Sequence, residues 1–185
     1  MKVPTMSPCL PPPRWLLAPL AAALFAASPA IAQDTRAIAQ ADRTARIVER
    51  EVNEALARRA LEAEAREFAD CPPLGSRHER FRDRAGVTRL YRTEQGSDDS
   101  HVATRQYYDR EGRLRLVLIE AGAVNGTDLR DRIVFDEAGR RVRETRRRIA
   151  GPGYTFPARW PDDWMVPAPD RSFASADPCG IAPPR

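Results

Sequence analysis

The chain has 185 residues, of which 30% are charged and 42% are hydrophobic, and this composition is typical of one ordinary globular domain. Its formal net charge is +4, and without Lys2 and Arg14 of the first 32 residues it has 28 basic against 26 acidic residues. A charge this small does not indicate a nucleic-acid partner.

Residues 1–32 have the pattern of a secretory signal peptide. Arg14 precedes an apolar run at 15–27, and Ala30-Ile31-Ala32 supplies the small residues of a cleavage site before Gln33. The run is short for a membrane span, so a stable span after cleavage is not expected, and an uncleaved anchor is the alternative. The sequence therefore predicts a periplasmic or secreted protein whose residues 33–185 form one domain.

Two cysteines, Cys71 and Cys179, remain after this cleavage. An even number of cysteines in an exported protein predicts a disulfide. It would tie the C-terminal tail to the end of the first structural element. The alternative is a pair of buried free thiols.

Residues 33–73 are predicted to form a long amphipathic helix. Asp34 or Thr35 can cap it, residues 36–69 contain no Gly or Pro, and apolar side chains recur at three- and four-residue spacing. A second row of alternating charges at four-residue intervals indicates a solvated face. Because such a helix is about 50 Å long, it must overhang the sheet, bend, or pack on another chain as a helix-mediated oligomer.

Residues 74–150 are predicted to form an antiparallel meander after an irregular stretch at 74–86. Two Asp-x-x-Gly turns, Asp109 to Gly112 and Asp136 to Gly139, and the Asn125-Gly126 pair are strong hairpin signals. Strand 113–123 is apolar on both faces, as a central strand is, and strand 140–149 is nearly all polar, as an edge strand is. The five expected strands are 87–93, 101–108, 113–123, 129–135 and 140–149.

Around the two Asp-x-x-Gly turns, residues 107–114 and 134–142 resemble the units of YD- and MORN-type β-repeats. The similarity covers about nine residues in each copy and implies β-hairpins, without a function.

Residues 151–185 form a tail rich in Pro and aromatic residues, which cannot be a central strand. We expect the tail to lie over the sheet, with a helical turn at Pro161 to Trp164. The predicted fold class is α+β: a long N-terminal helix packed on a meander of about five strands, completed by an irregular Pro/aromatic tail.

The densest run of charge, the arginines of residues 140–148, is a candidate binding strip for an anionic lipid headgroup, a polyanionic saccharide or an acidic protein. The alternative is an edge strand whose arginines pair with carboxylates on neighbouring strands. Trp160 and Trp164 are candidates for stacking on sugars or anchoring a partner, and the alternative is that they cover the sheet. The arginines of the run are Arg140, Arg141, Arg143, Arg146, Arg147 and Arg148.

Catalysis has little support in the sequence. The predicted mature chain has two histidines, His78 and His101, whereas a zinc site takes three or four ligands. Ser100 and His101 are adjacent on a predicted strand, where they point to opposite faces. No catalytic residue, metal or cofactor is predicted.

The leading hypothesis is a non-catalytic exported protein that binds an envelope protein or an anionic envelope component. The alternatives are a hydrolase acting on envelope polymers and a small secreted inhibitor that presents the loop at 95–100.

Overall fold

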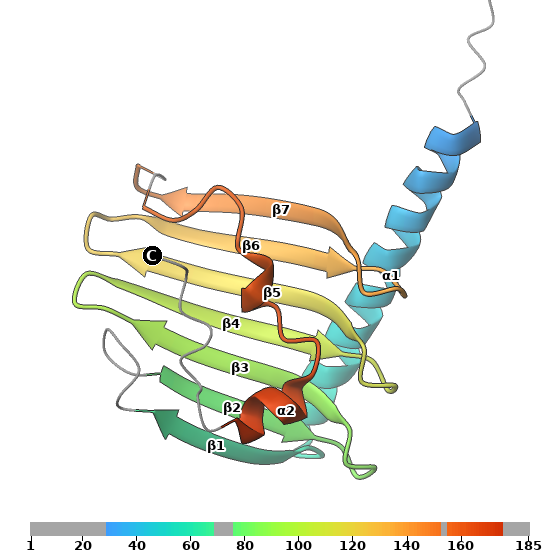
Figure 1. Cartoon of the computed structure of the whole chain (residues 1–185), viewed down its shortest axis with the longest axis horizontal. Helices are drawn as coiled ribbons and strands as arrows, with labels where there is room; N and C mark the ends of the chain where they lie inside the picture. The colour runs from blue at the N-terminus through green and yellow to red at the C-terminus, as the bar shows by residue number, and fades with distance from the viewer. Residues whose placement is uncertain (1–28, 69–75, 153–154, 176–185) are drawn as a thin grey trace, which may run out of the picture.

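The computed structural model describes residues 29–68, 76–152 and 155–175 (Figure 1). A long helix, α1 (Pro29–Ala57), precedes one seven-stranded sheet, and a C-terminal segment, the strap (residues 155–175), follows it. The strap contains a 3-10 turn, η1 (Asp162–Trp164), and a short helix, α2 (Pro169–Ala174). The strands are β1 (Glu62–Phe68), β2 (Ser76–Arg82), β3 (Thr88–Gly96), β4 (Ser100–Tyr108), β5 (Leu114–Ala123), β6 (Asp128–Phe135) and β7 (Arg141–Ala150).

The strand order follows the chain, and every neighbouring pair is antiparallel, so the sheet is a plain meander. The α+β class is confirmed, and the five predicted strands correspond to β3–β7. The strand count was wrong, because two further strands, β1 and β2, precede them. β5 is buried on both faces, as predicted for a central strand.

The predicted helix was too long: α1 ends at Ala57, and residues 62–68 form β1 instead. The break is at Arg59, which has a positive φ of 54°. Residues 62–68 are good helix formers, but they pair along their whole length with β2, from Glu62 opposite Arg82 to Phe68 opposite Ser76. Opposite charges face each other across this pair, and non-local pairing outweighs local helix propensity.

The stretch at 76–82, predicted to be irregular, forms β2. Its residues are nearly all polar, so they lack the alternation of apolar and polar residues that marks a half-buried strand. The strand is stabilised by ion pairs with β1, including 2.6 Å between Arg80 and Glu64 and 3.0 Å between Arg77 and Glu67.

The predicted turns are confirmed. Oδ1 of Asp109 accepts the backbone N–H groups of Glu111 and Arg113 at 3.0 and 2.9 Å, and Gly112 takes a φ of +76°. Burial raises the pKa of Asp109, but hydrogen bonds from Arg113 and Arg115 outweigh that effect and leave the pKa below its usual range. The turn aspartate is therefore held as a carboxylate.

α1 covers one face of the sheet. Ala41, Ala45, Val48 and Val52 are buried and pack on apolar side chains of β3–β6, which confirms this part of the predicted stripe. The N-terminal end of the helix extends past β7 (Figure 1), which is one of the three alternatives that the predicted helix length left open. Within the described residues, no helix is both long enough and apolar enough to cross a membrane.

The strap covers the other face, which confirms the predicted position for residues 155–175 of the tail, and η1 confirms the predicted helical turn. Gln106 in β4 fastens the strap backbone, because its amide donates to the Trp164 carbonyl at 3.0 Å and accepts the Val166 N–H at 2.8 Å. The Tyr108 hydroxyl donates to the Val166 carbonyl at 2.6 Å. Cys71 and Cys179 lie outside the described residues, so their disulfide remains a prediction.

Candidate anion-binding site

The pleat of β7 divides the arginine run between the two faces of the sheet. Arg143 and Arg147 lie on the α1 face, opposite Val134 and Arg130 of β6. Arg146 and Arg148 lie on the strap face, as alternation along a strand requires.

Two members of the run depart from this alternation. A register shift beside Phe135 leaves Val142 as an extra residue, and this bulge turns Arg141 to the strap face. Arg140 precedes β7, and its side chain bonds Asp136 in the turn at 2.7 Å. The six arginines therefore do not form one continuous strip.

On the strap face, arginines of β7 hold the strap. Arg146 binds Asp131 through Nε at 2.9 Å and Nη2 at 2.5 Å, and it donates to the Pro157 carbonyl at 2.7 Å. The hydrogen bond with Asp131 raises the pKa of Arg146. Arg141 donates to the Trp160 carbonyl at 2.8 Å. Arg148 donates to the Pro152 carbonyl, just after β7, at 3.0 Å. These side chains are engaged in tertiary structure.

The two candidate tryptophans belong to the strap, and their side chains pack into the core on the strap face of the sheet. Trp160 and Trp164 are 1% and 7% exposed, and their ring centroids are 5.0 Å apart. Nε1 of Trp160 donates to the buried carboxylate of Asp131. Both rings therefore pack in the core that joins strap and sheet.

The α1 face presents a different arrangement, which we call the basic groove. It has a volume of about 380 Å³ and lies between α1 and the surface of β4–β7. Arginines from four elements line it, together with Leu118, Val134 and Thr145. They are Arg46 of α1, Arg105 of β4, Arg130 and Arg132 of β6, and Arg143 and Arg147 of β7.

At the helix side of the basic groove, one carboxylate is shared by three arginines. Asp42 lies 3.0 Å from Arg46, 3.9 Å from Arg132 and 4.0 Å from Arg143. Glu49, two helical turns further on, binds Arg132 at 2.7 Å. Two α1 carboxylates therefore face three guanidinium groups.

At the sheet side, Glu120 of β5 is the nearest carboxylate. It binds Arg105 at 2.6 Å and lies 3.7 Å from Arg130. Arg147 forms no ion pair with any residue that the structure describes, and its side chain is exposed. Across the described residues, six groove arginines thus have three carboxylate partners.

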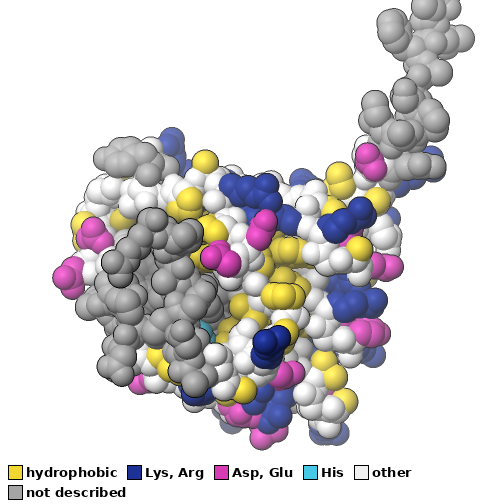
Figure 2. Space-filling model, in the orientation of Figure 1, with side chains coloured by type: hydrophobic (Ala, Val, Ile, Leu, Met, Phe, Trp, Pro, Cys, Tyr) yellow, Lys and Arg dark blue, Asp and Glu magenta, His cyan; other side chains and the backbone are white. Residues whose placement is uncertain are grey.

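A second groove, of about 870 Å³, lies beside η1 and the turns at 109–113 and 136–140. Its floor is apolar, and its charges balance: three arginines, at 113, 141 and 159, face three acids, at 137, 162 and 163. Figure 2, which views the strap side, shows positive and negative side chains interspersed there. This groove has no preference for one sign of charge.

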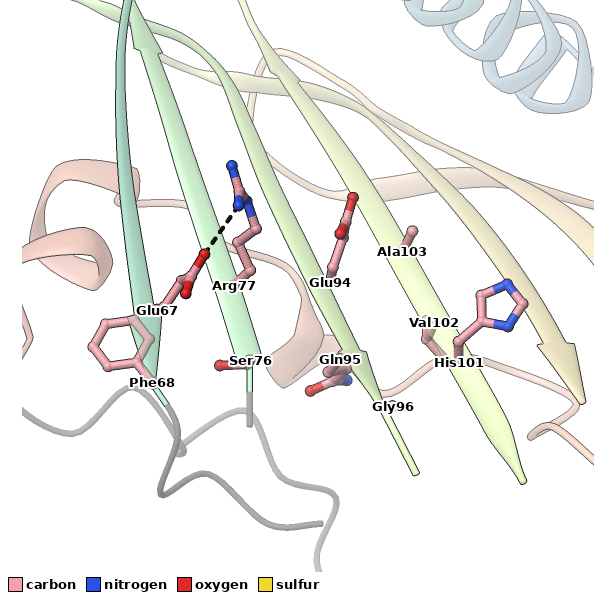
Figure 3. Close-up of a pocket in the computed structure, with 10 residues that line it drawn as sticks. All are labelled: Glu67, Phe68, Ser76, Arg77, Glu94, Gln95, Gly96, His101, Val102 and Ala103. Carbon is pink, nitrogen blue, oxygen red and sulfur yellow. Dashed lines mark hydrogen bonds and ion pairs between the residues drawn. The ribbon is translucent and has the colours of Figure 1, made fainter. Parts of the chain in front are cut away.

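A depression of about 710 Å³ lies at the ends of β1–β4 (Figure 3). Glu67 of β1 and Arg77 of β2 form an ion pair at 3.0 Å on the α1 face. Their neighbours Phe68 and Ser76, which also lie opposite each other, point to the strap face because side chains alternate along a strand. Its lining groups therefore do not converge on one point.

One hydrogen-bonded series of side chains was not predicted from the sequence. Ser76 Oγ lies 3.2 Å from His78 Nε2, and His78 Nδ1 lies 2.9 Å from the Tyr91 hydroxyl. Burial, aided by the charge of Arg66, lowers the pKa of His78, and burial raises the pKa of Tyr91 to about 12. The Ser-x-His spacing is the signal that could have found it, because residues i and i+2 share a strand face.

Ser100 and His101, which are adjacent in the sequence, contact different residues. Ser100 Oγ bonds Ser97 Oγ at 2.8 Å in the turn between β3 and β4, whereas His101 lies against Gly122 of β5. Within the described ranges, no group of three His, Cys, Asp or Glu side chains is placed to hold a metal ion.

Comparisons of the chain with models of protein families, with curated proteins and with solved structures found no match.

Proposed function

We propose that the chain is an exported, non-catalytic protein that binds an anionic group of an envelope macromolecule in the basic groove. Export rests on the signal-peptide pattern of residues 1–32. The observation that supports binding is the convergence of six arginines from α1, β4, β6 and β7 on one groove, with three carboxylates as partners.

The physical argument is electrostatic. A groove with an excess of one charge attracts the opposite charge, and the low-dielectric wall formed by α1 and the sheet focuses that field. Guanidinium groups donate paired, charge-assisted hydrogen bonds to carboxylate or phosphate oxygens. An anionic polymer or headgroup therefore supplies the negative charge that the groove arginines lack within the protein.

The test measures binding of the mature chain, residues 33–185, to polygalacturonate and to vesicles containing phosphatidylglycerol, with phosphatidylcholine vesicles as the neutral reference. We expect binding at ~0.01 M salt that weakens at ~0.5 M salt, because screening shortens the range of charge interactions. The double variant R105Q/R143Q should lose binding, because it removes two groove arginines.

The matched control is R140Q/R148Q, which removes the same charge from the turn and the strap face. It should bind like the parent chain. E120Q should bind more tightly, since it releases Arg105 and Arg130 from their shared carboxylate. Equal losses in the two double variants, or no binding to either probe at low salt, would refute the proposal.

A hydrolase acting on envelope polymers is the second candidate, and the Ser76–His78–Tyr91 chain favours it. His78 can accept the Ser76 proton at Nε2 while Nδ1 donates to the Tyr91 hydroxyl. His78 is 2% exposed, however, and both ring nitrogens have partners, so the chain also satisfies a buried histidine. Labelling of Ser76 by a fluorophosphonate, abolished in S76A, would support the hydrolase.

The inhibitor hypothesis has less support. It relied on residues 95–100 as a protruding loop, but β3 extends to Gly96 and β4 starts at Ser100. The connection is a short turn closed by a 2.7 Å hydrogen bond from the Ser97 N–H to the Ser100 carbonyl.

A further inference from the structure

We propose that the basic groove recognises a phosphate monoester, with Arg130 and Arg147 as the pair that binds it. This inference rests on the proposed function and names the ligand class for the same site.

The first observation is a like-charge pair. Arg130 of β6 and Arg147 of β7 are register partners, so their side chains leave adjacent strands at the same point and on the same face. Like charges directly opposite one another destabilise a sheet. At the neighbouring positions the two charges are opposite in sign, because Arg146 lies opposite Asp131 and binds it.

The second observation is that this repulsion has little internal compensation. Among the described residues, Arg130 has one carboxylate within ion-pair distance, Glu120 at 3.7 Å, and that carboxylate is bound more closely by Arg105 at 2.6 Å. Arg147 has none, and the Arg130 side chain is 61% exposed. Both guanidinium groups are therefore available to an external anion.

The size of the charge excess selects the ligand class. Six arginines against Asp42, Glu49 and Glu120 leave an excess of three positive charges around the groove. Asp131 also lines the groove, but Arg146 on the strap face neutralises it. A carboxylate, a phosphodiester or a sulfate ester carries a single negative charge, whereas a phosphate monoester carries about −1.5 to −2 at pH 7 with three acceptor oxygens. The monoester removes more of the excess than the monoanionic groups do.

The geometry agrees with the same class. Arg130 and Arg147 approach from β6 and β7, and Arg105 approaches from β4 on the far side of Glu120. Guanidinium groups from different strands can each engage a different oxygen of a tetrahedral group, while a planar carboxylate offers one edge. Two sources carry this chemistry: a soluble phosphorylated saccharide and a lipid such as phosphatidic acid.

The experiment compares probes that differ in charge and little else. The mature chain is titrated with glucose 6-phosphate and with glucose 6-sulfate, and separately with vesicles containing phosphatidic acid or phosphatidylglycerol. We expect the monoester of at least one pair to bind about tenfold more tightly than its monoanionic counterpart. Preference within the first pair identifies a soluble ligand, and preference within the second pair alone identifies a lipid headgroup.

Variants test the binding pair. R147E should weaken monoester binding by about tenfold or more, and its melting temperature without ligand should be equal to or higher than that of the parent chain, since an acid opposite Arg130 replaces repulsion with attraction. R148E makes the same charge change at the next residue, on the strap face, and should bind nearly as well as the parent chain. R147K keeps the charge without the planar fork and should bind with intermediate affinity.

Three outcomes separate this inference from the proposed function. If neither monoester exceeds its counterpart, while polygalacturonate binding still depends on Arg105 and Arg143, the phosphate assignment is wrong and the anion-binding proposal stands. Equal losses in R147E and R148E overturn the assignment of the pair. If no anionic probe binds, both proposals fail.

Discussion

Asp131→Asn is predicted to loosen the strap from the sheet. The Asp131 side chain is fully buried, it binds Arg146 through two nitrogens, and it accepts Nε1–H of Trp160. Neutralising one partner of a buried ion pair costs about 3–5 kcal/mol. Because the Arg146 side chain is 26% exposed and keeps its bond to Pro157, we expect the lower figure, about 3 kcal/mol.

For a chain of this size, each kcal/mol lowers the melting temperature by about 2–4 °C, so the variant should melt roughly 6–12 °C lower. Urea unfolding followed by tryptophan fluorescence suits the question, because Trp160 and Trp164 are both in the strap. Circular dichroism at the amide band then follows the sheet separately.

The matched control is E120Q, which breaks a pair whose side chains are 43% and 37% exposed. An exposed pair of this kind contributes about 0–1 kcal/mol. If D131N is no less stable than E120Q, the Asp131–Arg146–Trp160 contacts do not fasten the strap, and the reasoning is wrong.

Two further predictions concern the turns. Asp109→Asn should lower stability at pH 7 by about 3 kcal/mol, because Arg115 is 2% exposed and loses a charged partner. Since hydrogen bonds hold the folded pKa of Asp109 below its usual range despite burial, this stabilisation is complete above about pH 4 and is lost as the pH falls through the lower folded value. Urea midpoints of the two chains should therefore converge below about pH 4, and a constant gap down to acid pH would contradict this. Gly139→Ala should lower the free energy of unfolding by about 1 kcal/mol, for its positive φ alone. Gly151→Ala should lower it by about 3 kcal/mol or more, because a Cβ there would lie 2.4 Å from the backbone of the β5–β6 hairpin. Similar melting temperatures for the two variants would show that the hairpin moves to accommodate the Cβ.

Some strands of the sheet are specified by local sequence and others only by their partners. β4–β7 were located to within one residue at each end, because Asp-x-x-Gly and Asn-Gly specify the turns between them by local hydrogen bonds and by the positive φ of glycine. β3 ends three residues later than predicted, at Gly96. β1 was mistaken for helix, because its residues favour a helix locally and only the pairing with β2 decides otherwise.

The candidate site shows the same division. The arginine run was found in the sequence, but its six members divide between two faces and a turn, since a strand alternates and one bulge at Val142 shifts the alternation. The basic groove draws Arg46, Arg105, Arg130 and Arg132 from elements that no local pattern links to β7.

The sequence by itself determined the central meander, the apolar stripe of the helix and the aromatic cover of the sheet, because turn chemistry and hydrophobic periodicity act over a few residues. The tertiary structure decided where the helix ends, which arginines are neutralised and which are left facing one another. Those outcomes depend on partners far apart in the chain, and Arg146 and Arg147 illustrate this: they are neighbours in sequence, yet one lies opposite Asp131 and the other opposite Arg130.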